Sequence, residues 1–435
     1  MINARQIAFE ALIKTFKNDA YSNLMLDKIL SKTNIDTRDK AFVSALFYGT
    51  IERKITIDYQ LAKYLSKPLK KLKPEVLVIL EMGAYQILFM DKVPDSAAVN
   101  ESVTLAKKNG VSFAGGLINA VLRKIVANGI SLPDEKDKIK YLSIKFSCPS
   151  EYIELWFDEL GESDTVALLE STVGSADIII RVNTLRCSSD ELIETLNSEG
   201  FSAEKTYLDN ALSIELNGHD IENLDSYKKG LFHVQDLSCQ ICSRALGAKA
   251  GDIVFDLCSA PGGKAFTIAQ HMNDKGTVKC FDLYKNRVEL ISKGAARLGL
   301  TSIKAQVCDA SVYNMDIGLA DSVLCDVPCS GLGIIRRKPE IKYKAIESLS
   351  GLPEIQYNIL NNAARYVRKS GTLVYSTCTI IKRENENVCE RFLAENKDFY
   401  PVAPAPDISQ EKFLTLLPHK NGGDGFFIAV FKRKE

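Results

Sequence analysis

The sequence predicts a multidomain fold: an all-α bundle, a small α+β module, and an α/β domain built on a mostly parallel sheet. A chain of 435 residues is too long for one ordinary core and corresponds to two or three domains of about 100–200 residues each. Hydrophobic spacing is helical over residues 1–132 and mixed over 133–229. Over 230–435 it alternates between short apolar strands and helices. These three stretches are the predicted domains.

Residues 1–132 are expected to fold as successive helices. Apolar residues recur at helical spacing, for example Ile7, Leu12 and Phe16. Asp36-Thr37 and Lys73-Pro74 have the form of helix starts, the second with proline in the first turn. An all-helical bundle is the simplest structure with this pattern.

Residues 133–229 change character. A helical pattern runs over 138–173 and is followed by a strand-like run over 176–183. A further helix is expected near 189–198 and a short strand near 212–216. The sequence therefore predicts a small α+β connector between the two larger parts.

Residues 230–435 alternate between strands and helices. The predicted strands are 252–257, 277–282, 303–308, 322–327 and 372–376. The predicted helices between them include 285–298, 353–368 and 384–396. Such alternation is typical of a mostly parallel sheet with helices on both faces.

The composition excludes several classes of protein. At 46% hydrophobic and 25% charged, the chain is near the globular average, which excludes disordered, collagenous and disulfide-scaffold proteins. The N-terminus lacks the pattern of an export signal, and no apolar run reaches the ~18 residues of a membrane-spanning helix. We expect a cytoplasmic protein without a membrane partner, whose 11 cysteines are reduced.

Cysteine spacing does not indicate a metal site. Cys239 and Cys242 form one CxxC pair without a second, so zinc is not expected. Most single cysteines pack as small apolar groups. We expect such packing for four cysteines at the ends of predicted strands: Cys258, Cys280, Cys308 and Cys325.

Charge is distributed unevenly between the predicted domains. The chain has 55 basic and 55 acidic side chains, and this zero net charge taken alone argues against a nucleic-acid partner. Counted separately, residues 1–132 carry +7, residues 133–229 carry −12 and residues 230–435 carry +5. The acidic middle masks two basic parts, so neutrality does not exclude RNA.

A glycine-containing loop follows the first strand of the α/β domain. It reads Asp256-Leu257-Cys258-Ser259-Ala260-Pro261-Gly262-Gly263-Lys264 and leads into a helix. Ligands of open α/β sheets bind at the carboxyl ends of strands, and glycine lets the backbone approach them closely. A Walker A motif would need Gly at Cys258 and Ser or Thr at Ala265, and the loop is not GxGxxG either. A nucleotide phosphate is therefore disfavoured, and a structural turn is the alternative.

Aspartates follow the next two strands. Asp282 ends the second strand, where a carboxylate accepts hydrogen bonds from ribose hydroxyls, and Asp309 follows the third, where adenine contacts are expected. Either aspartate alone is more often a cap or turn residue. Together with Asp256 they favour a nucleoside ligand without pyrophosphate, which fits S-adenosylmethionine.

Two cysteines and an aspartate follow the fourth and fifth strands. Asp326 and Cys329 follow the fourth and Cys378 the fifth, so adjacent strands would bring them to one edge of the sheet. Carbon 5 of a pyrimidine becomes nucleophilic when a thiolate adds at carbon 6. Asp326 is the candidate acid or hydrogen-bond partner of ring nitrogen 3. A second thiol or a base is then needed to help remove the carbon-5 proton and release the enzyme. Spacing alone leaves open which thiol attacks.

These motifs in this order resemble the RNA cytosine-5 methyltransferase family. The resemblance implies a Rossmann-like methyltransferase domain in which Cys378 is the nucleophile and Cys329 assists product release, with Asp326 beside them. It also implies a set of residues that line the S-adenosylmethionine site: Cys258, Ser259, Ala260, Pro261, Gly262, Gly263, Lys264, Asp282, Asp309 and Asp326.

The N-terminal third carries a second resemblance. Residues 93–101 and 116–123 are similar to the helical RNA-binding domain of NusB. This fusion is similar to the bacterial RsmB (Sun/Fmu) group of the family, which implies methylation of 16S (small-subunit) ribosomal RNA. Residues 417–430 fit as an antiparallel hairpin that closes the sheet, with a turn at Asn421-Gly422.

The expected partner is therefore small-subunit ribosomal RNA, with no metal and no obligate protein partner. Arg336 and Arg337 are candidate phosphate contacts because they follow the Cys329 loop. A transfer-RNA cytosine-5 methyltransferase is one alternative, and the NusB-like part argues against it. A non-catalytic RNA-binding ribosome-assembly factor is another, and the paired thiols argue against that.

Overall fold

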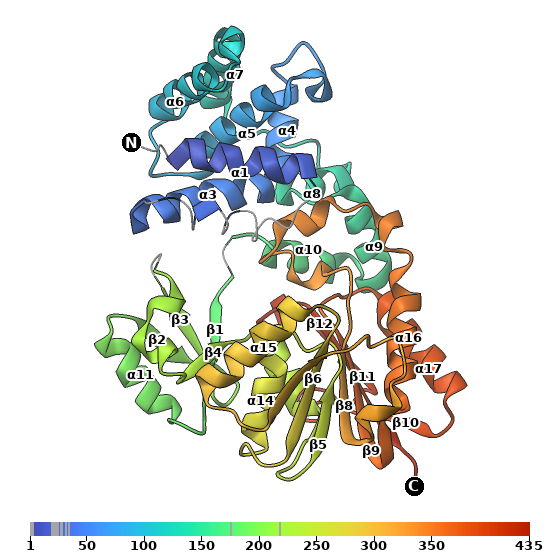
Figure 1. The fold of residues 1–435 in the computed structure, drawn as a ribbon. Helices are drawn as coiled ribbons and strands as arrows, with labels where there is room; N and C mark the ends of the chain where they lie inside the picture. The colour runs from blue at the N-terminus through green and yellow to red at the C-terminus, as the bar shows by residue number, and fades with distance from the viewer. Residues whose placement is uncertain are drawn as a thin grey trace. The chain divides into compact units, whose positions relative to one another are not determined.

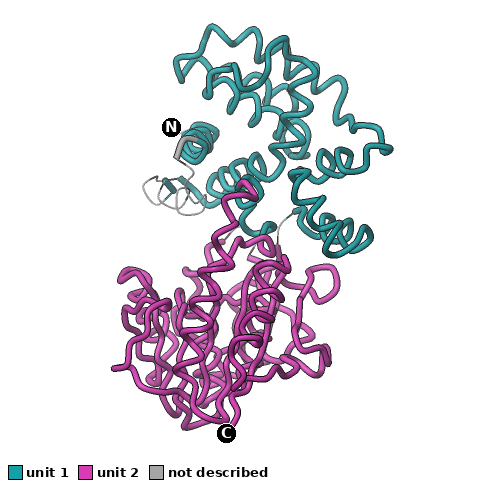
Figure 2. The backbone as a smooth tube through the Cα atoms, turned by 90° about the vertical axis from the view of Figure 1, so that its right-hand side faces the viewer, with its two compact units in different colours: residues 1–174, 335–344 teal, residues 175–334, 345–435 magenta. Residues whose placement is uncertain are grey.

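The protein is described from a computed structural model, which covers residues 4–18, 26, 29–30, 33, 35–174, 176–216 and 219–435 (Figure 1). These residues form two compact units (Figure 2). The first contains residues 1–174 and 335–344, and the second contains residues 175–334 and 345–435. The helices predicted over 138–173 belong to the first unit and the strands that follow them to the second. The domain boundaries at 132 and 229 stay a prediction.

The first unit confirms the predicted helical bundle. Asp36 caps α3 by accepting a hydrogen bond from Asp39 N at 2.7 Å, and Pro74 is the first residue of α5. Its core contains fully buried apolar side chains such as Leu46, Ile79 and Leu122. The helices are α1 (Ala4–Asn18), α3 (Thr37–Glu52), α4 (Lys54–Ala62), α5 (Pro74–Phe89), α6 (Asp95–Lys108), α7 (Gly115–Asn128), α8 (Lys138–Phe146), α9 (Ser150–Leu160) and α10 (Glu162–Ser171).

The helical pattern predicted over 138–173 is divided into the three helices α8, α9 and α10. Ser147 ends α8 with a φ of +53°, and Pro149 cannot continue the helix before it. Gly161 separates α9 from α10 with a φ of +80°. The apolar spacing continues across these breaks, so periodicity alone did not reveal them.

Residues 335–344 belong to the first unit although they follow Cys329 closely in the sequence. Lys342, which is only 3% exposed, donates from Nζ to Glu52 O at 2.8 Å, and burial lowers its pKa to about 8. Tyr343 donates from its hydroxyl to Ile51 O at 2.6 Å. Arg336 and Arg337 lie half-buried in this segment. Sequence analysis predicted no such excursion of the chain.

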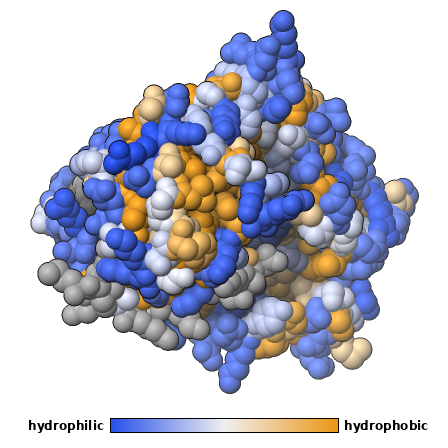
Figure 3. Space-filling view, turned by 90° about the horizontal axis from the view of Figure 1, so that it is seen from above, coloured by the Kyte–Doolittle hydropathy of each residue, from blue (hydrophilic) through white to orange (hydrophobic). Residues whose placement is uncertain are grey.

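The surface of the first unit carries aromatic rings beside lysines. Phe113 is 69% exposed, and Lys73 Nζ lies 5.1 Å from its ring centroid. Lys124 Nζ lies 5.8 Å from the ring of Tyr64. One face of the protein shows an apolar area bordered by hydrophilic residues (Figure 3).

The second unit begins with a four-stranded antiparallel sheet of order β2-β3-β1-β4. Its strands are β1 (Ile178–Val182), β2 (Ser202–Lys205), β3 (Ala211–Glu215) and β4 (Phe232–Val234). Helix α11 (Ser189–Ser198) starts with a capping box between Ser188 and Glu191. Its Leu192 packs in one core with Ile180, Leu212 and Phe232. The α+β character predicted for this part is confirmed, although β4 lies beyond the predicted boundary at 229 and the helices over 138–173 belong to the first unit.

The large sheet confirms the predicted α/β architecture. Its order is β10-β12-β9-β8-β5-β6-β7, with β11 paired to β12. Strands β5 to β9 run parallel, whereas β10, β11 and β9 are antiparallel to β12. The strands are β5 (Ile253–Asp256), β6 (Thr277–Asp282), β7 (Ile303–Val307), β8 (Ala320–Asp326), β9 (Val367–Thr377), β10 (Phe399–Val402), β11 (Phe413–Leu416) and β12 (Phe426–Arg433).

Helices cover both faces of this sheet, as Figure 1 shows. Val254 on one face packs in a core with α13 (Leu237–Ala245), α14 (Gly263–His271) and α15 (Lys285–Leu298). The next residue, Phe255, points to the other face and packs with α16 (Leu352–Ala364) and α17 (Glu386–Glu395). Both faces of the sheet are therefore covered by helices, so a ligand can reach the sheet at the edge formed by its strand ends.

The C-terminal hairpin forms, but its turn differs from the prediction. Strands β11 and β12 pair antiparallel, with Phe413 opposite Ala429. The connection is not a two-residue Asn-Gly turn, because Pro418 starts the short helix α18 (Pro418–Asn421). Gly422, with a φ of +62°, ends that helix.

Candidate active site

The predicted site residues lie at the carboxyl ends of the parallel strands. In the register of β8 and β9, Asp326 stands opposite Ser376. The loops after these strands carry Cys329 and Cys378, so the two thiols approach each other across neighbouring strand ends. Along the same edge, Asp256 and Asp282 are the last residues of β5 and β6, and the loop after β7 carries Asp309.

The two cysteines are in direct contact. Their sulfur atoms are 3.1 Å apart, and both residues are half-buried. The hydrogen bond with Cys378, together with burial, raises the pKa of Cys329 well above its ordinary value. Cys329 therefore keeps its proton more firmly than a free thiol does, and it can donate that proton toward the Cys378 sulfur.

Asp326 is held between a lysine and a serine. Lys264 Nζ lies 2.7 Å from Asp326 Oδ2, and Ser376 Oγ donates to Asp326 Oδ1 at 2.9 Å. Burial lowers the pKa of Lys264, but the Asp326 carboxylate outweighs burial and holds that pKa well above its ordinary value. Lys264 was predicted only as a cofactor-loop residue, whereas its ammonium group contacts the predicted catalytic carboxylate.

The glycine loop is tightly folded around its backbone. Gly262 has a φ of +109° and precedes α14, and a Cβ atom there would lie 2.4 Å from the Phe266 ring. Ser259 N donates to Phe281 O at 2.8 Å, which ties the loop to β6. Glycine at position 262 is therefore required by both conformation and space.

Asp282 and Asp309 have different surroundings. Asp282 is buried, and its Oδ2 lies 3.3 Å from Arg287 Nη1, while Arg287 Nη2 donates to Ala260 O at 3.0 Å. Arg287 therefore connects Asp282 to the glycine loop. Asp309 is exposed and accepts hydrogen bonds from Ser311 N at 2.9 Å and Ser311 Oγ at 2.6 Å. The structure brings Asp282 to the loop and leaves Asp309 in a local turn.

Asp256 is the most deeply buried of the four aspartates along this edge. It is 1% exposed, and neither of its oxygens makes a hydrogen bond of normal geometry within the described residues. Burial raises its pKa to about 7. A buried carboxyl group without full bonding retains the capacity to bind a ligand.

Sequence reasoning missed several polar residues of the site. Arg287 stands one turn into α15, where a surface arginine is unremarkable. Gln356, Glu384 and Asn385 are buried and bond to the two cysteine loops. The one available signal was the placement of Glu384 and Asn385 just after the Cys378 motif. Their burial depends on contacts between distant segments.

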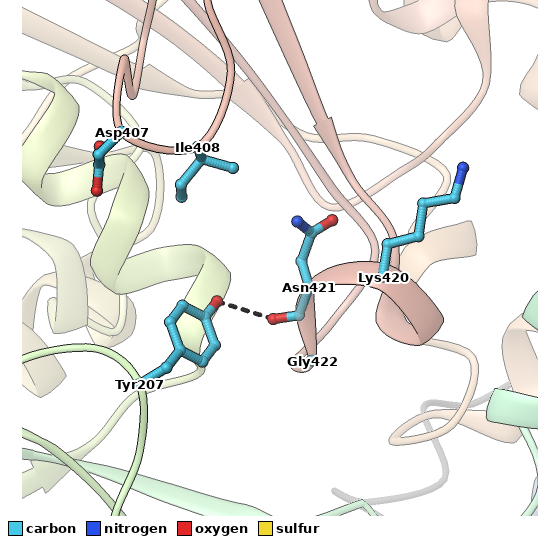
Figure 4. Close-up of a pocket in the computed structure, with 6 residues that line it drawn as sticks. All are labelled: Tyr207, Asp407, Ile408, Lys420, Asn421 and Gly422. Atoms are coloured by element: carbon cyan, nitrogen blue, oxygen red, sulfur yellow. Dashed lines mark hydrogen bonds between the residues drawn. The ribbon is translucent and has the colours of Figure 1, made fainter.

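A separate pocket of about 480 Å³ lies elsewhere in the second unit. It is lined by Tyr207, Asp407, Ile408, Lys420, Asn421 and Gly422 (Figure 4). The Tyr207 hydroxyl donates to Asn421 O at 2.8 Å across it. No predicted site residue lines this pocket.

In the described part of the chain, no helix combines the length and apolar character that a membrane span requires. Within the same residues, no cluster of three or more His, Cys, Asp or Glu side chains has the arrangement of a metal site.

Three family profiles match the chain. Residues 243–432 match the 16S rRNA methyltransferase RsmB/F family. Residues 2–127 match the NusB family, and residues 148–219 match the ferredoxin-like domain of RsmF/B-like methyltransferases. The matches follow the order of the parts described above.

Known proteins match over the whole length. The probable ribosomal RNA small subunit methyltransferase B of Bacillus subtilis (strain 168) is 36% identical, over 99% of each chain. The crystal structure of PH0851 covers 100% of this chain and 99% of its own, with a TM-score of 0.83 and 25% identity. The structure of NSun6 from Pyrococcus horikoshii with SFG covers 66% of this chain and 98% of its own. Its TM-score of 0.60 and its sequence identity of 23% show that the two chains share a similar fold.

Proposed function

Since the chain belongs to the RsmB family of ribosomal RNA small subunit methyltransferases, we propose that it methylates carbon 5 of a specific cytosine in 16S ribosomal RNA through a covalent bond between Cys378 and carbon 6. Membership of this family shows a ribosomal RNA methyltransferase, and we assign S-adenosylmethionine as its methyl donor. The cytosine chemistry is supported above all by the 3.1 Å contact between the Cys329 and Cys378 sulfurs beside Asp326.

The residues present fit S-adenosylmethionine. Asp256 keeps unused hydrogen-bonding capacity at the end of β5, and Asp282 offers a buried carboxylate at the end of β6. The backbone of Gly262 and Gly263 has no side chain to keep a ligand away. We assign residues 258–264, Asp282, Asp309 and Asp326 to its binding, with Asp309 at the exposed edge. When bound, the cofactor supplies the methyl group.

Cys378 performs the first covalent step. Its thiolate forms a bond to carbon 6 of cytosine, and the electron pair of the C5–C6 double bond moves to carbon 5, which becomes the nucleophile. For this step Asp326 takes up a proton and donates it in a hydrogen bond to ring nitrogen 3, which stabilises the negative charge that develops there. Lys264 and Ser376 each hold one Asp326 oxygen, which orients the carboxyl group.

Cys329 acts in the last step. After methyl transfer the Cys329 sulfur, which has lost its own proton to solvent, accepts the proton from carbon 5. The electron pair of the C–H bond reforms the C5–C6 double bond, and the Cys378–C6 bond breaks with Cys378 leaving as a thiolate. Cys329 lies in sulfur contact with Cys378 and provides the second thiol that assists this release. The raised pKa of Cys329 suits this role, because it makes the deprotonated sulfur a stronger base for the carbon-5 proton.

The target base must be unpaired or flipped out of its stack to reach Cys378. The helical unit, which matches the NusB family, is assigned to RNA binding. Its lysine–aromatic pairs, Lys73 with Phe113 and Lys124 with Tyr64, offer both phosphate contact and stacking surface. We place this activity in the cytoplasm.

Bisulfite sequencing of RNA from cells that lack the protein tests the proposal. We expect the loss of one methylcytosine in 16S ribosomal RNA, with restoration by the intact gene but not by a C378A variant. Loss of a methylcytosine from a transfer RNA instead would favour the transfer-RNA alternative. An unchanged pattern in both RNA classes, with a defect in ribosome assembly, would favour the non-catalytic alternative.

A further inference from the structure

Two consecutive buried side chains contact the two cysteine loops. Glu384 ends the short helix η8 (Lys382–Glu384), and Asn385 directly precedes α17. Both residues are 0% exposed. Polar side chains are rarely buried so completely unless they form hydrogen bonds with neighbouring groups of the protein.

Glu384 holds the loop of Cys329. Ser330 N donates to Glu384 Oε2 at 2.9 Å, and Gln356 Nε2 of α16 donates to the same oxygen at 2.8 Å. Gln356 Nε2 also donates to Pro328 O at 3.0 Å. Pro328 and Ser330 flank Cys329, so the peptide groups on both sides of this cysteine are fixed through one carboxylate and one amide.

Asn385 holds the loop of Cys378 in the same manner. Thr377 Oγ1 donates to Asn385 Oδ1 at 2.6 Å, and Asn385 Nδ2 donates to Thr379 O at 3.1 Å. Thr377 and Thr379 flank Cys378. Each of the two neighbouring residues, Glu384 and Asn385, therefore serves a different cysteine.

Direct bonds join the two loops as well. Ser330 Oγ donates to Thr379 Oγ1 at 2.8 Å, and Gly333 N donates to Cys378 O at 3.0 Å. The Tyr375 hydroxyl donates to the backbone oxygen of Glu384 at 2.5 Å, which anchors the pair to β9. Glu384 Oε1 and Gln356 Oε1 have no hydrogen-bond partner among the described residues, so the loops are anchored through Glu384 Oε2 and Gln356 Nε2.

We propose that Glu384 and Asn385 are positioning residues for the two-thiol reaction: Glu384 places Cys329, Asn385 places Cys378, and together they set the distance between the sulfurs. Their hydrogen bonds reach the residues on either side of each cysteine rather than the reacting atoms. The catalytic consequence rests on the proposed function. The sulfur distance itself is testable without RNA.

The first test measures thiol proximity by oxidation with diamide. Cys329 and Cys378 lose two hydrogens and form one disulfide, while diamide gains both hydrogens and becomes the hydrazine. Mass spectrometry of the joined peptides gives the rate in the intact protein. We expect E384A and N385A to slow this rate about fivefold or more, since the loops lose their anchors.

Matched surface variants serve as controls. Glu395 and Asn396, at the far end of α17, bond to Tyr357 and Asn361 rather than to the cysteine loops. E395A and N396A should oxidise at the wild-type rate. Wild-type oxidation rates in folded E384A and N385A would overturn the proposal.

Conservative variants cover the case in which an alanine variant fails to fold. E384Q keeps an acceptor oxygen for Ser330 and Gln356, so it should behave nearly as the wild type. N385D keeps the acceptor for Thr377 but loses the donor to Thr379, so it should oxidise more slowly. Equal behaviour of these two variants contradicts the assignment.

The second test uses an unmodified 16S ribosomal RNA transcript and S-adenosylmethionine. E384A should accumulate a denaturant-resistant protein–RNA adduct, because release by Cys329 is impaired. N385D placed in a C329A background should form that adduct about tenfold more slowly than C329A alone, because attack by Cys378 is impaired. Equal slowing of adduct formation by both changes indicates a general structural role and overturns the proposal.

The two tests separate this inference from the proposed function. If C329A forms no adduct with any RNA, the proposed cytosine chemistry fails, and the diamide rates still decide whether Glu384 and Asn385 set the sulfur distance. If the adduct forms in C329A and the oxidation rates do not change, only the positioning role is wrong.

Discussion

The two halves of the active-site edge are built differently. After β8 and β9, the residues that flank Cys329 and Cys378 are bonded to buried side chains, and the sulfurs are in contact. At the ends of β5 and β6, Asp256 makes no hydrogen bond of normal geometry with any described residue, and Asp282 faces an arginine that is 48% exposed. The reacting groups are thus fixed in advance, whereas the cofactor side keeps its polar groups available for a ligand.

The largest expected effect on activity comes from a change in the loops after β8 and β9, which carry the two cysteines. C378A should abolish methyl transfer, a loss of about 10³-fold or more, because no other group can form the bond to carbon 6. Transfer of a labelled methyl group to 16S ribosomal RNA measures this loss. S-adenosylmethionine should still bind with nearly unchanged affinity, as calorimetry can show, and retained methyl transfer would refute the nucleophile assignment.

C329A should have the next largest effect and a different character. Turnover should fall about 10²-fold or more, while the covalent protein–RNA adduct accumulates because its release is blocked. A slow band on a denaturing gel reports the adduct. Appearance of this band with C378A instead of C329A would reverse the two roles.

On the cofactor side, D282A should weaken binding of S-adenosylmethionine about 10- to 100-fold, which is the loss expected for hydrogen bonds to a charged group. The rate at saturating cofactor should change little. D309A is the matched comparison and should have the smaller effect, because Asp309 is exposed and bonded within its own turn. An equal or larger effect of D309A on affinity would show that the two carboxylates have been ranked wrongly.

The smallest effect concerns stability and its pH dependence. Burial raises the pKa of Asp256 to about 7, from 3.8, so between these values the folded protein holds a proton that the unfolded chain has lost. Stability therefore falls as pH rises from about 4 to about 7 and stays low above that range.

D256N, which stays uncharged, should remove this dependence. Relative to D256N, the wild type should lose about 1–3 kcal/mol of unfolding free energy between pH 5 and pH 8, measured by urea unfolding without cofactor. D398N is the control, since Asp398 is 74% exposed. Parallel pH profiles of the wild type and D256N would contradict the assignment.

Local pattern was sufficient for much of the fold. The strand over 277–282 and the helix over 285–298 occur with the predicted bounds. Asp256, Asp282 and Asp326 end their strands and both cysteines lie just after strands. These positions could be predicted because strand–helix alternation is visible in the hydrophobic spacing. Strand β10 was not predicted, since its pairing with β12 depends on a distant partner.

The parts that sequence could not reveal depend on contacts between distant segments. Nothing near Lys264 in the sequence indicates that its ammonium group contacts Asp326. Glu384 and Gln356 meet only after β9 and α16 pack against the sheet, and neither belongs to a motif. The roles of the predicted catalytic and cofactor residues stay predictions until the variants above are measured.

Residues 335–344 have a consequence for how this protein can be divided or recombined. The polypeptide passes between the two units at 174/175, 334/335 and 344/345, so no single cleavage releases both of them whole. A fragment that begins after residue 174 would leave the Lys342 ammonium without its acceptor, the backbone oxygen of Glu52. Exchange of the helical unit with that of a relative would therefore have to include this internal segment as well as the N-terminal part.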